Sequence, residues 1–429
     1  MDASTTQAFY DSGKSLFDKG FGLVRRVGEN LTHWPGGDSD EVDSAAADVP
    51  ARPESEKTFR VFVLGTSGSG KTTFLASMYK RLSVQHPDVG FYLHADVGQG
   101  KILTRKYQQL ADPEEDWPAG TLRSEVSDWR FTCTHVGEGG SVDVFKISYL
   151  DYAGESLTES LDGQDFEPGS EAQKADSVLV LLDGQKVLRF MDGRSGGYLG
   201  SLEHDLDYLL PMVQKLHAKP LHFVVSKWDV VEDRYSLAEI RRKLLGHEQF
   251  KVIINRRRER GVAVRLIPVS ALGSGFAALN ESGFMVKRRD AGAPSPYQVE
   301  LSIACTLIDH FQAAARRLSA EEQEILLNPR RLMGVPAGVG RSAIWALKHL
   351  ATVLPSLGEF RIGAVVLSAL LSGLDEKLSD WSDDIKREFE QALAKVEGES
   401  AAVDAIVLKN LVLIKVLDAE HPGSNLLHV

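Results

Sequence analysis

Residues 65–72 read Gly-Thr-Ser-Gly-Ser-Gly-Lys-Thr and match the pattern GxxxxGK[ST], between a short apolar run and an amphipathic segment. The run Arg60–Leu64 predicts a strand, and the apolar spacing of Lys71–Leu82 predicts a helix. Glycines at such a junction let the backbone wrap closely around a phosphate, so that N–H groups and the helix N-terminus point at the anion. We therefore expect a phosphate-binding loop in which Lys71 reaches the β- and γ-phosphates of a nucleotide. The residues expected to surround these phosphates are Gly65, Thr66, Ser67, Gly68, Ser69, Gly70, Lys71, Thr72 and Thr73.

Short β-rich runs alternate with helical segments after Thr58, an order typical of a mostly parallel sheet covered by helices on both faces. Apolar helical spacing after Pro296 closes this pattern. We therefore expect an α/β nucleotide-binding domain over residues 58–318, followed by a helical C-terminal extension over residues 319–429. The expected strands are Arg60–Leu64, Arg130–Val136, Val142–Leu150, Val178–Leu182, His222–Val225 and Arg265–Val269, the second and third of which are candidates for a hairpin.

The chain ahead of this domain has two parts. The apolar spacing predicts an amphipathic segment over residues 1–35, whose apolar side over residues 4–34 could contact a membrane or a partner, or pack on the protein's own body. Residues 36–57 are acidic, rich in Ala, Ser and Pro, and without apolar periodicity. Such a composition predicts a disordered linker.

A tetrapeptide after the expected strand His222–Val225 points to the base of the nucleotide. Ser226-Lys227-Trp228-Asp229 resembles the NKxD element of GTPases, with Ser226 in place of Asn. The resemblance implies that Asp229 accepts hydrogen bonds from guanine N1 and N2 and that the stem of Lys227 covers the base. Adenine offers no donors at those atoms, so a site of this kind would reject it. Ser270-Ala271-Leu272, after the next expected strand, resembles the SAK loop that touches guanine, with Leu272 in place of Lys.

A third element, Asp151-Tyr152-Ala153-Gly154, matches DxxG at the end of an apolar strand. The resemblance implies that Asp151 holds Mg²⁺ through a water and that the backbone N–H of Gly154 contacts the γ-phosphate. Glu155 follows, at the place where Ras-like GTPases carry a water-positioning Gln. A carboxylate there could orient or deprotonate water, but it also adds negative charge, and slow intrinsic turnover is expected.

A switch threonine that binds Mg²⁺ beside Thr72 is expected between residues 85 and 128. Thr121, in the stretch Trp-Pro-Ala-Gly-Thr at residues 117–121, is the first candidate, and Thr104 is the competitor. Arg105 and Arg123 are candidates for an internal arginine finger, with exposed ion pairs as the alternative role.

Taken together, residues 58–318 resemble the translation-factor-related (TRAFAC) class of P-loop GTPases, which includes Ras-like proteins. The forms DYAGE at residues 151–155 and WPAGT at residues 117–121 are most similar to bacterial double-GTPase domains of conflict or defence systems. The resemblance implies hydrolysis of GTP to GDP with Mg²⁺ as a conformational switch, with Lys71, Gly154 and Glu155 in catalytic roles. The alternative is a nearly inert GTP-dependent interaction module that needs a partner for hydrolysis.

The composition excludes several other classes of protein. A formal net charge of −11 over 429 residues argues against general nucleic-acid binding, and we interpret the cluster Arg256, Arg257, Arg258 and Arg260 as a solvated helix end rather than a nucleic-acid patch. Two cysteines without a CxxC pair support neither a disulfide framework nor a thiolate metal site. The N-terminus lacks the features of a secretory signal, and the apolar stretch Ile362–Leu371 is too short to span a bilayer. A cytoplasmic chain with an unidentified effector or activating protein is expected, and its oligomeric state stays open.

Overall fold

The computed structural model describes residues 58–118, 126–137, 140–152, 173–194, 200–281, 283–316 and 399–427. The chain divides into two compact units, and the unit considered below comprises Thr58–Val136, Ser141–Ser319 and Ala405–Val429. The expected amphipathic segment, the acidic linker and most of the C-terminal extension lie outside the described residues. Among the described residues, no helix has both the length and the apolarity needed to cross a membrane.

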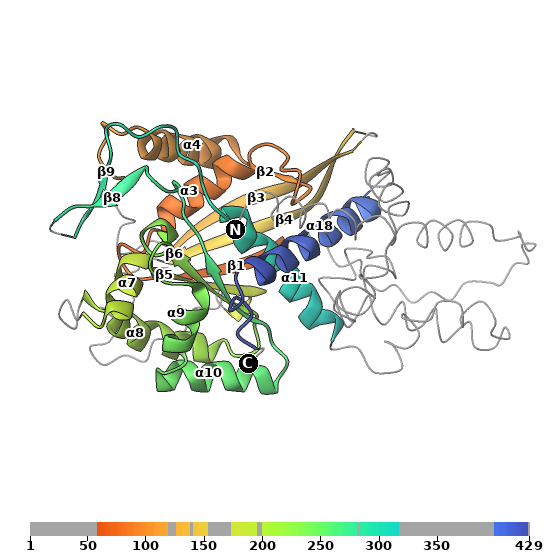
Figure 1. The fold of residues 1–429 in the computed structure, drawn as a ribbon. Helices are drawn as coiled ribbons and strands as arrows, with labels where there is room; N and C mark the ends of the chain where they lie inside the picture. Colours follow the sequence, from red (N-terminus) through yellow and green to blue (C-terminus); the bar gives the residue numbers. More distant parts are fainter. Residues whose placement is uncertain are drawn as a thin grey trace, which may run out of the picture. The chain divides into compact units, whose positions relative to one another are not determined.

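One seven-stranded sheet forms the centre of this unit, in the order β2-β3-β4-β1-β5-β6-β7 (Figure 1). The five strands from β4 to β7 in this order run parallel, and β2 is antiparallel to β3. The predicted fold class, an α/β fold with a mostly parallel sheet, is therefore confirmed. The strands are β1 (Thr58–Leu64), β2 (Tyr92–Ala95), β3 (Val126–Gly137), β4 (Gly140–Tyr152), β5 (Ser177–Asp183), β6 (Leu221–Ser226) and β7 (Val264–Pro268), and a separate pair comprises β8 (Ala277–Leu279) and β9 (Met285–Lys287).

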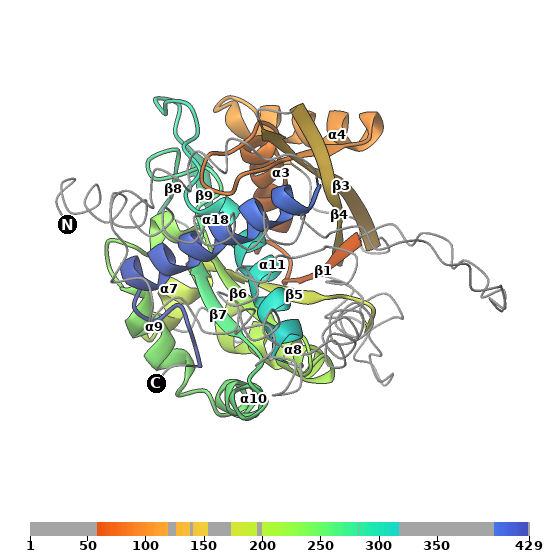
Figure 2. The same cartoon turned by 90° about the vertical axis from the view of Figure 1, so that its right-hand side faces the viewer.

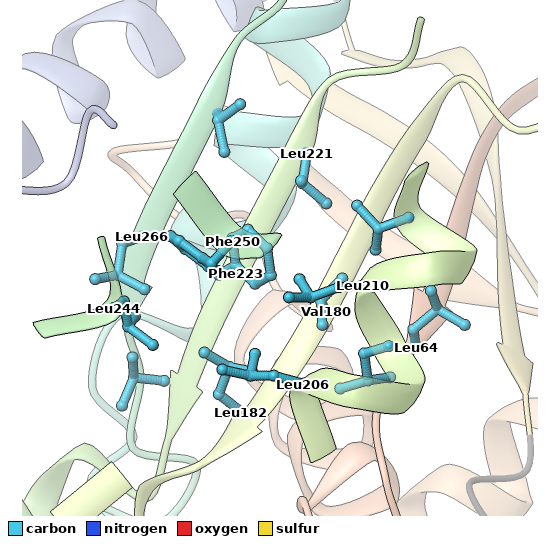
Figure 3. Close-up of a cluster of buried hydrophobic side chains, with 14 of the residues drawn as sticks. Leu64, Val180, Leu182, Leu206, Leu210, Leu221, Phe223, Leu244, Phe250 and Leu266 are labelled. Carbon is cyan, nitrogen blue, oxygen red and sulfur yellow. The ribbon is translucent and has the colours of Figure 1, made fainter. Parts of the chain in front are cut away.

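Helices cover both faces of the sheet, which explains why every residue of β5, β6 and β7 is buried. On one face, alternate strand residues such as Val180 and Phe223 pack against side chains such as Leu206 and Phe250 from the covering helices (Figure 3). On the other face, α11 packs on β5 and β6 (Figure 2). The helices are α3 (Lys71–Leu82), α4 (Val97–Ala111), α7 (Gly184–Asp192), α8 (Leu202–Lys215), α9 (Leu237–Leu244), α10 (Glu248–Glu259), α11 (Val299–Ala315) and α18 (Glu399–Glu420).

The arginine cluster ends α10, as expected of a helix end, but one of its members is not solvated. Arg257 is 1% exposed, and its Nη2 donates to the carbonyl oxygens of Val213 and Leu216 at 3.0 and 3.1 Å. The reading of this whole cluster as a solvated surface is therefore wrong for Arg257, which joins α10 to the end of α8. A lone buried arginine among charged neighbours has no distinguishing sequence signal.

Residues 85–118 are more regular than the sequence suggested. They form β2 and then α4, whose N-terminus is capped by the Asp96 carboxylate, which accepts hydrogen bonds from the backbone of Gly98 and Gln99. Among the apolar residues of α4, Leu103 and Leu110 are buried, so the helix gives only a weak apolar pattern. The competing switch candidate Thr104 lies exposed on this helix.

The C-terminal residues belong to the same unit as the sheet, although the sequence placed them in a separate extension. After α18, the backbone N–H of Leu266 donates to the Ser424 carbonyl at 2.7 Å, and the N–H of Leu426 donates to the Val264 carbonyl at 2.9 Å. Asn425 forms an antiparallel bridge with Arg265. The end of the chain therefore pairs with the outer edge of β7.

Candidate nucleotide site

The loop between β1 and α3 has the backbone that its glycines predict. Gly68 and Gly70 adopt φ values of 80° and 87°, which side-chain-bearing residues rarely adopt. A Cβ atom on Gly65 would lie 2.6 Å from the Ser69 Oγ and 3.2 Å from a backbone oxygen of β5. No side chain caps α3, so its N-terminus can stabilise an anion through the helix dipole. The strand, loop and helix together with the sheet order make this an α/β P-loop GTPase fold.

Lys71 and Asp151 form the charged centre of the site. Lys71 is 8% exposed, and its Nζ donates to the Gly65 carbonyl at 2.6 Å. Asp151 lies at the end of β4, paired with Val63 of β1. Burial lowers the pKa of Lys71, and the nearby Asp151 carboxylate opposes this shift. Burial also raises the pKa of Asp151 to about 6, against the opposing charges of Lys71 and Lys106.

Asp151 has the properties expected of a residue that holds a cation. The residue is 2% exposed, and its buried Oδ1 has no hydrogen-bond partner among the described residues. Such an orphaned carboxylate oxygen is costly unless a ligand or water completes it. The described residues contain no cluster of three acidic, His or Cys ligands, so a metal here would depend on phosphate oxygens and the Thr72 hydroxyl. This sparse oxygen donor set fits Mg²⁺, which keeps several waters and uses one or two protein ligands.

The burial of Asp151 predicts an unusual effect of Asp151→Asn. Because the pKa of this carboxyl is raised in the folded protein, its contribution to stability is greatest at low pH and is lost as the pH rises through about 6. Without nucleotide or Mg²⁺, the neutral amide should therefore raise Tm at pH 7.5 by about 2 to 6 °C, and this gain should vanish towards pH 4. Thermal melts of both proteins across this range measure the difference. A variant less stable than the wild type at pH 7.5 would show that Asp151 is not held at a desolvation cost.

The segment after β6 donates hydrogen bonds to the backbone of the phosphate loop. The Ser226 hydroxyl donates to the Ser69 carbonyl at 2.8 Å. Lys227 adopts a φ of 51°, and its Nζ donates to the Gly68 carbonyl at 3.0 Å and to the Asp183 carboxylate at 3.0 Å. The structure thus brings two of the predicted base-site residues into contact with the loop. The Ser226 hydroxyl thus makes this hydrogen bond at the position where the NKxD element carries an Asn.

Asp229 and Ser270 follow two different strands, β6 and β7, and are in contact. The Ser270 hydroxyl donates to Asp229 Oδ1 at 2.5 Å and accepts a hydrogen bond from the backbone N–H of Gly273 at 2.9 Å. Burial raises the pKa of Asp229, and the Ser270 hydrogen bond opposes that shift. The loop after β7 therefore fixes the carboxylate expected to read the base.

The two residues after Ser270 are held against α3. The Ala271 carbonyl accepts a hydrogen bond from the Ser77 hydroxyl at 2.5 Å. Leu272 is 7% exposed and packs with Ala76, Leu110 and Phe276. Its apolar side chain, at the place of the expected Lys, is thus part of an apolar cluster.

Three polar residues beside the phosphate loop were not identified from the sequence, namely Asp183, Lys186 and Asp205. The Thr66 hydroxyl donates to Asp205 Oδ2 at 2.9 Å, and Lys186 Nζ donates to Asp205 Oδ1 at 2.7 Å. Asp183, the partner of Lys227, directly follows an apolar run, which was a usable signal. Asp205 and Lys186 lie on helices without any motif, so their role depends on the tertiary arrangement.

Other predicted residues do not take part in this arrangement. Thr121, Gly154, Glu155 and Arg123 lie outside the described residues. Thr104 and Arg105 line an open groove of about 640 Å³ beside α4, with Tyr79, Asp96 and Lys101 among the other lining residues. No residue of the phosphate loop lines this groove.

Comparison with known proteins does not assign a family. No family model matches the chain, and no curated protein matches it. The signal recognition particle receptor SRb-GTP/SRX complex from Chaetomium thermophilum is 19% identical over 51% of this chain and 92% of that chain, with a TM-score of 0.29. Sup35 complexed with GDP is 13% identical over 59% of this chain and 46% of that chain, with a TM-score of 0.25. At such identities a likeness concerns the fold, whereas function depends on the site.

Proposed function

We propose that this protein binds GTP with Mg²⁺ and hydrolyses it to GDP and phosphate, acting as a nucleotide-dependent conformational switch. The observation that carries the proposal is that residues from four ordered motifs lie at the carboxyl ends of the parallel strands of one sheet. The phosphate loop follows β1, Asp151 ends β4, and Asp229 and Ser270 follow β6 and β7. Ligands of open α/β sheets bind at this edge.

The pair Asp229–Ser270 supports guanine as the base. An ionised carboxylate is an acceptor only, and each of its oxygens can accept more than one hydrogen bond. Asp229 can thus hold the Ser270 hydroxyl and still accept from guanine N1–H and the exocyclic amine. Adenine lacks these donors, so it would leave the half-buried Asp229 carboxylate without a hydrogen bond from the base.

At the phosphate end, Lys71 and the backbone amides would compensate the charge of the β- and γ-phosphates. The Lys71 ammonium already lies on the loop, where it donates to the Gly65 carbonyl. Thr72 and Asp151 would hold Mg²⁺, which when bound neutralises charge that develops on the phosphate oxygens. In this proposal the Gly154 N–H contacts the γ-phosphate, and Glu155 orients or deprotonates the attacking water.

For Glu155 we expect a selective loss of rate. Glu155→Ala should lower single-turnover GTP hydrolysis by about tenfold to a thousandfold with little change in GTP affinity, because only contacts made in the transition state are removed. Rapid-quench assays with excess enzyme measure the rate, and fluorescence titration measures the affinity. Glu159→Ala, which changes the same charge nearby, is the control. An unchanged or faster rate would make Glu155 a bystander.

The chemistry of Glu155 also supports a second candidate, a GTP-dependent interaction module that stays almost inert until a partner supplies catalytic groups. Single-turnover hydrolysis with and without candidate partners separates the two functions.

We further propose a place in the TRAFAC class, a role in a bacterial conflict or defence system and a cytoplasmic location. The two buried free cysteines support the location, and the motif forms at residues 117–121 and 151–155 support the class. Sedimentation with liposomes tests membrane contact through residues 4–34.

A further inference from the structure

The C-terminal tail, defined as residues 418–427, lies beside the loops expected to read the base. It begins in the last turn of α18 and continues along the edge of β7 (Figure 2). Within this tail, His421 contacts Trp228 and Tyr297. None of the recognised motifs includes this residue.

One contact of His421 leads to Ser270 through Tyr297. The Tyr297 hydroxyl lies 2.8 Å from His421 Nε2. Burial lowers the pKa of His421, and a neutral imidazole can accept a hydrogen bond from a hydroxyl. Tyr297 in turn exchanges two backbone hydrogen bonds with Ser270, at 3.1 and 2.8 Å. Because the Ser270 hydroxyl donates to Asp229 Oδ1, only two residues separate His421 from the base-reading carboxylate.

The second contact of His421 is with Trp228. The two rings pack edge to face with centroids 5.9 Å apart. Trp228 is 3% exposed and lies between Lys227 and Asp229 in the chain, and its backbone N–H donates to the Val269 carbonyl at 3.0 Å. His421 thus contacts the loop after β6 through Trp228 and reaches the loop after β7 through Tyr297.

The tail itself is anchored independently of these loops. Arg265 of β7 donates to Asp418 at 3.1 Å and to Asp309 of α11 at 2.7 Å. Asp309 also lies 2.9 Å from His222 Nε2. On the other side, a Cβ atom on Gly423 would lie 2.9 Å from the Ala238 Cα, so the tail fits closely against α9. A fixed support of this kind can hold a loop in one conformation.

We propose that His421 and Tyr297 are positioning residues for base recognition, which hold the Asp229–Ser270 pair in the geometry that selects guanine. This inference rests on the proposed GTP site and extends it to the far end of the chain. A carboxylate that accepts hydrogen bonds from two guanine donors must be oriented more precisely than a carboxylate that accepts from one donor. If Trp228 and Ser270 are held less firmly, guanine binding should therefore weaken more than the binding of a base that offers only one donor.

Inosine triphosphate provides this comparison, because hypoxanthine keeps N1–H and lacks the exocyclic amine. His421→Ala should weaken GTP binding by about threefold to tenfold and ITP binding less, so that the ratio of the two affinities falls. Tyr297→Phe removes only the hydroxyl and should shift the ratio in the same direction. Calorimetric titration of each full-length variant with GTP and ITP measures the ratio, and thermal melts report the stability.

Asn410→Ala is the matched control, since it removes a buried hydrogen bond from α18 to the Val89 carbonyl without touching the anchor at Asp418 or either base loop. It should lower Tm and leave the GTP/ITP ratio at the wild-type value. If His421→Ala and Tyr297→Phe lower Tm but also keep the wild-type ratio, the two residues are merely structural and the inference is wrong. A wild type that does not prefer GTP over ITP and ATP would instead overturn the guanine assignment, and this inference with it.

Discussion

Lys71→Ala is expected to lose tight triphosphate binding, by on the order of a hundredfold or more, while the fold stays intact. The substitution removes the main positive charge directed at the β- and γ-phosphates. It should cost little stability, because burial makes the charged ammonium unfavourable in the folded protein, which is why the pKa of Lys71 is lowered. Titration with GTP measures the affinity, and circular dichroism with thermal melts measures the fold.

Lys80→Ala is the matched control for this result. Lys80 lies exposed in the last turn of the same helix, so its removal changes the net charge equally without touching the loop. We expect it to bind GTP as the wild type does. If Lys71→Ala keeps wild-type GTP affinity with a normal spectrum, the assignment of residues 65–72 as the phosphate loop is wrong.

Asp229→Asn is expected to change which base the protein prefers. The loss of a charged hydrogen bond should weaken GTP by about 1.5 to 3 kcal/mol, or about one to two decades in affinity. Xanthine has a carbonyl at the 2-position, to which an amide can donate where the carboxylate could only repel. The variant should therefore bind XTP more tightly than GTP. Competition binding with GTP, XTP, ATP and ITP measures the change.

Asp233→Asn controls for the loss of charge near the base loop, because Asp233 is exposed only four residues further along the chain. It should leave the order of the four affinities unchanged. A variant Asp229→Asn that kept its preference for guanine would show that another group reads the base.

The parts of the fold that the sequence predicted well are those with strong local patterns. β5 and β6 are fully buried and mostly apolar because both faces of the sheet are covered, and the predicted helix Lys71–Leu82 agrees with α3 at both ends. β2 and α4 were missed because much of α4 faces solvent and gives little periodicity. The pairing of Ser424 and Leu426 with β7 is a contact between distant segments, which no local pattern encodes.

For the candidate site, the motifs identified residues by chain order, and the structure adds how they are held. Ser226 departs from the expected Asn, yet its hydroxyl still bonds to the phosphate loop. Asp205 and His421 act through contacts made only in the folded chain, with Thr66 and Trp228 respectively. Their residue types are common on helices and helix ends, so the sequence alone carries no signal for them.

The central claim is that this site selects guanine, and the affinity of the purified wild-type protein for GTP against ATP, in the presence of Mg²⁺, tests it most directly. Equilibrium competition against a labelled guanine nucleotide measures both affinities in one assay. A site that matches Asp229 to two guanine donors should favour GTP by about 10⁴ or more. Equal binding of ATP and GTP would contradict the account and make this chain a P-loop nucleotide-binding protein of another kind.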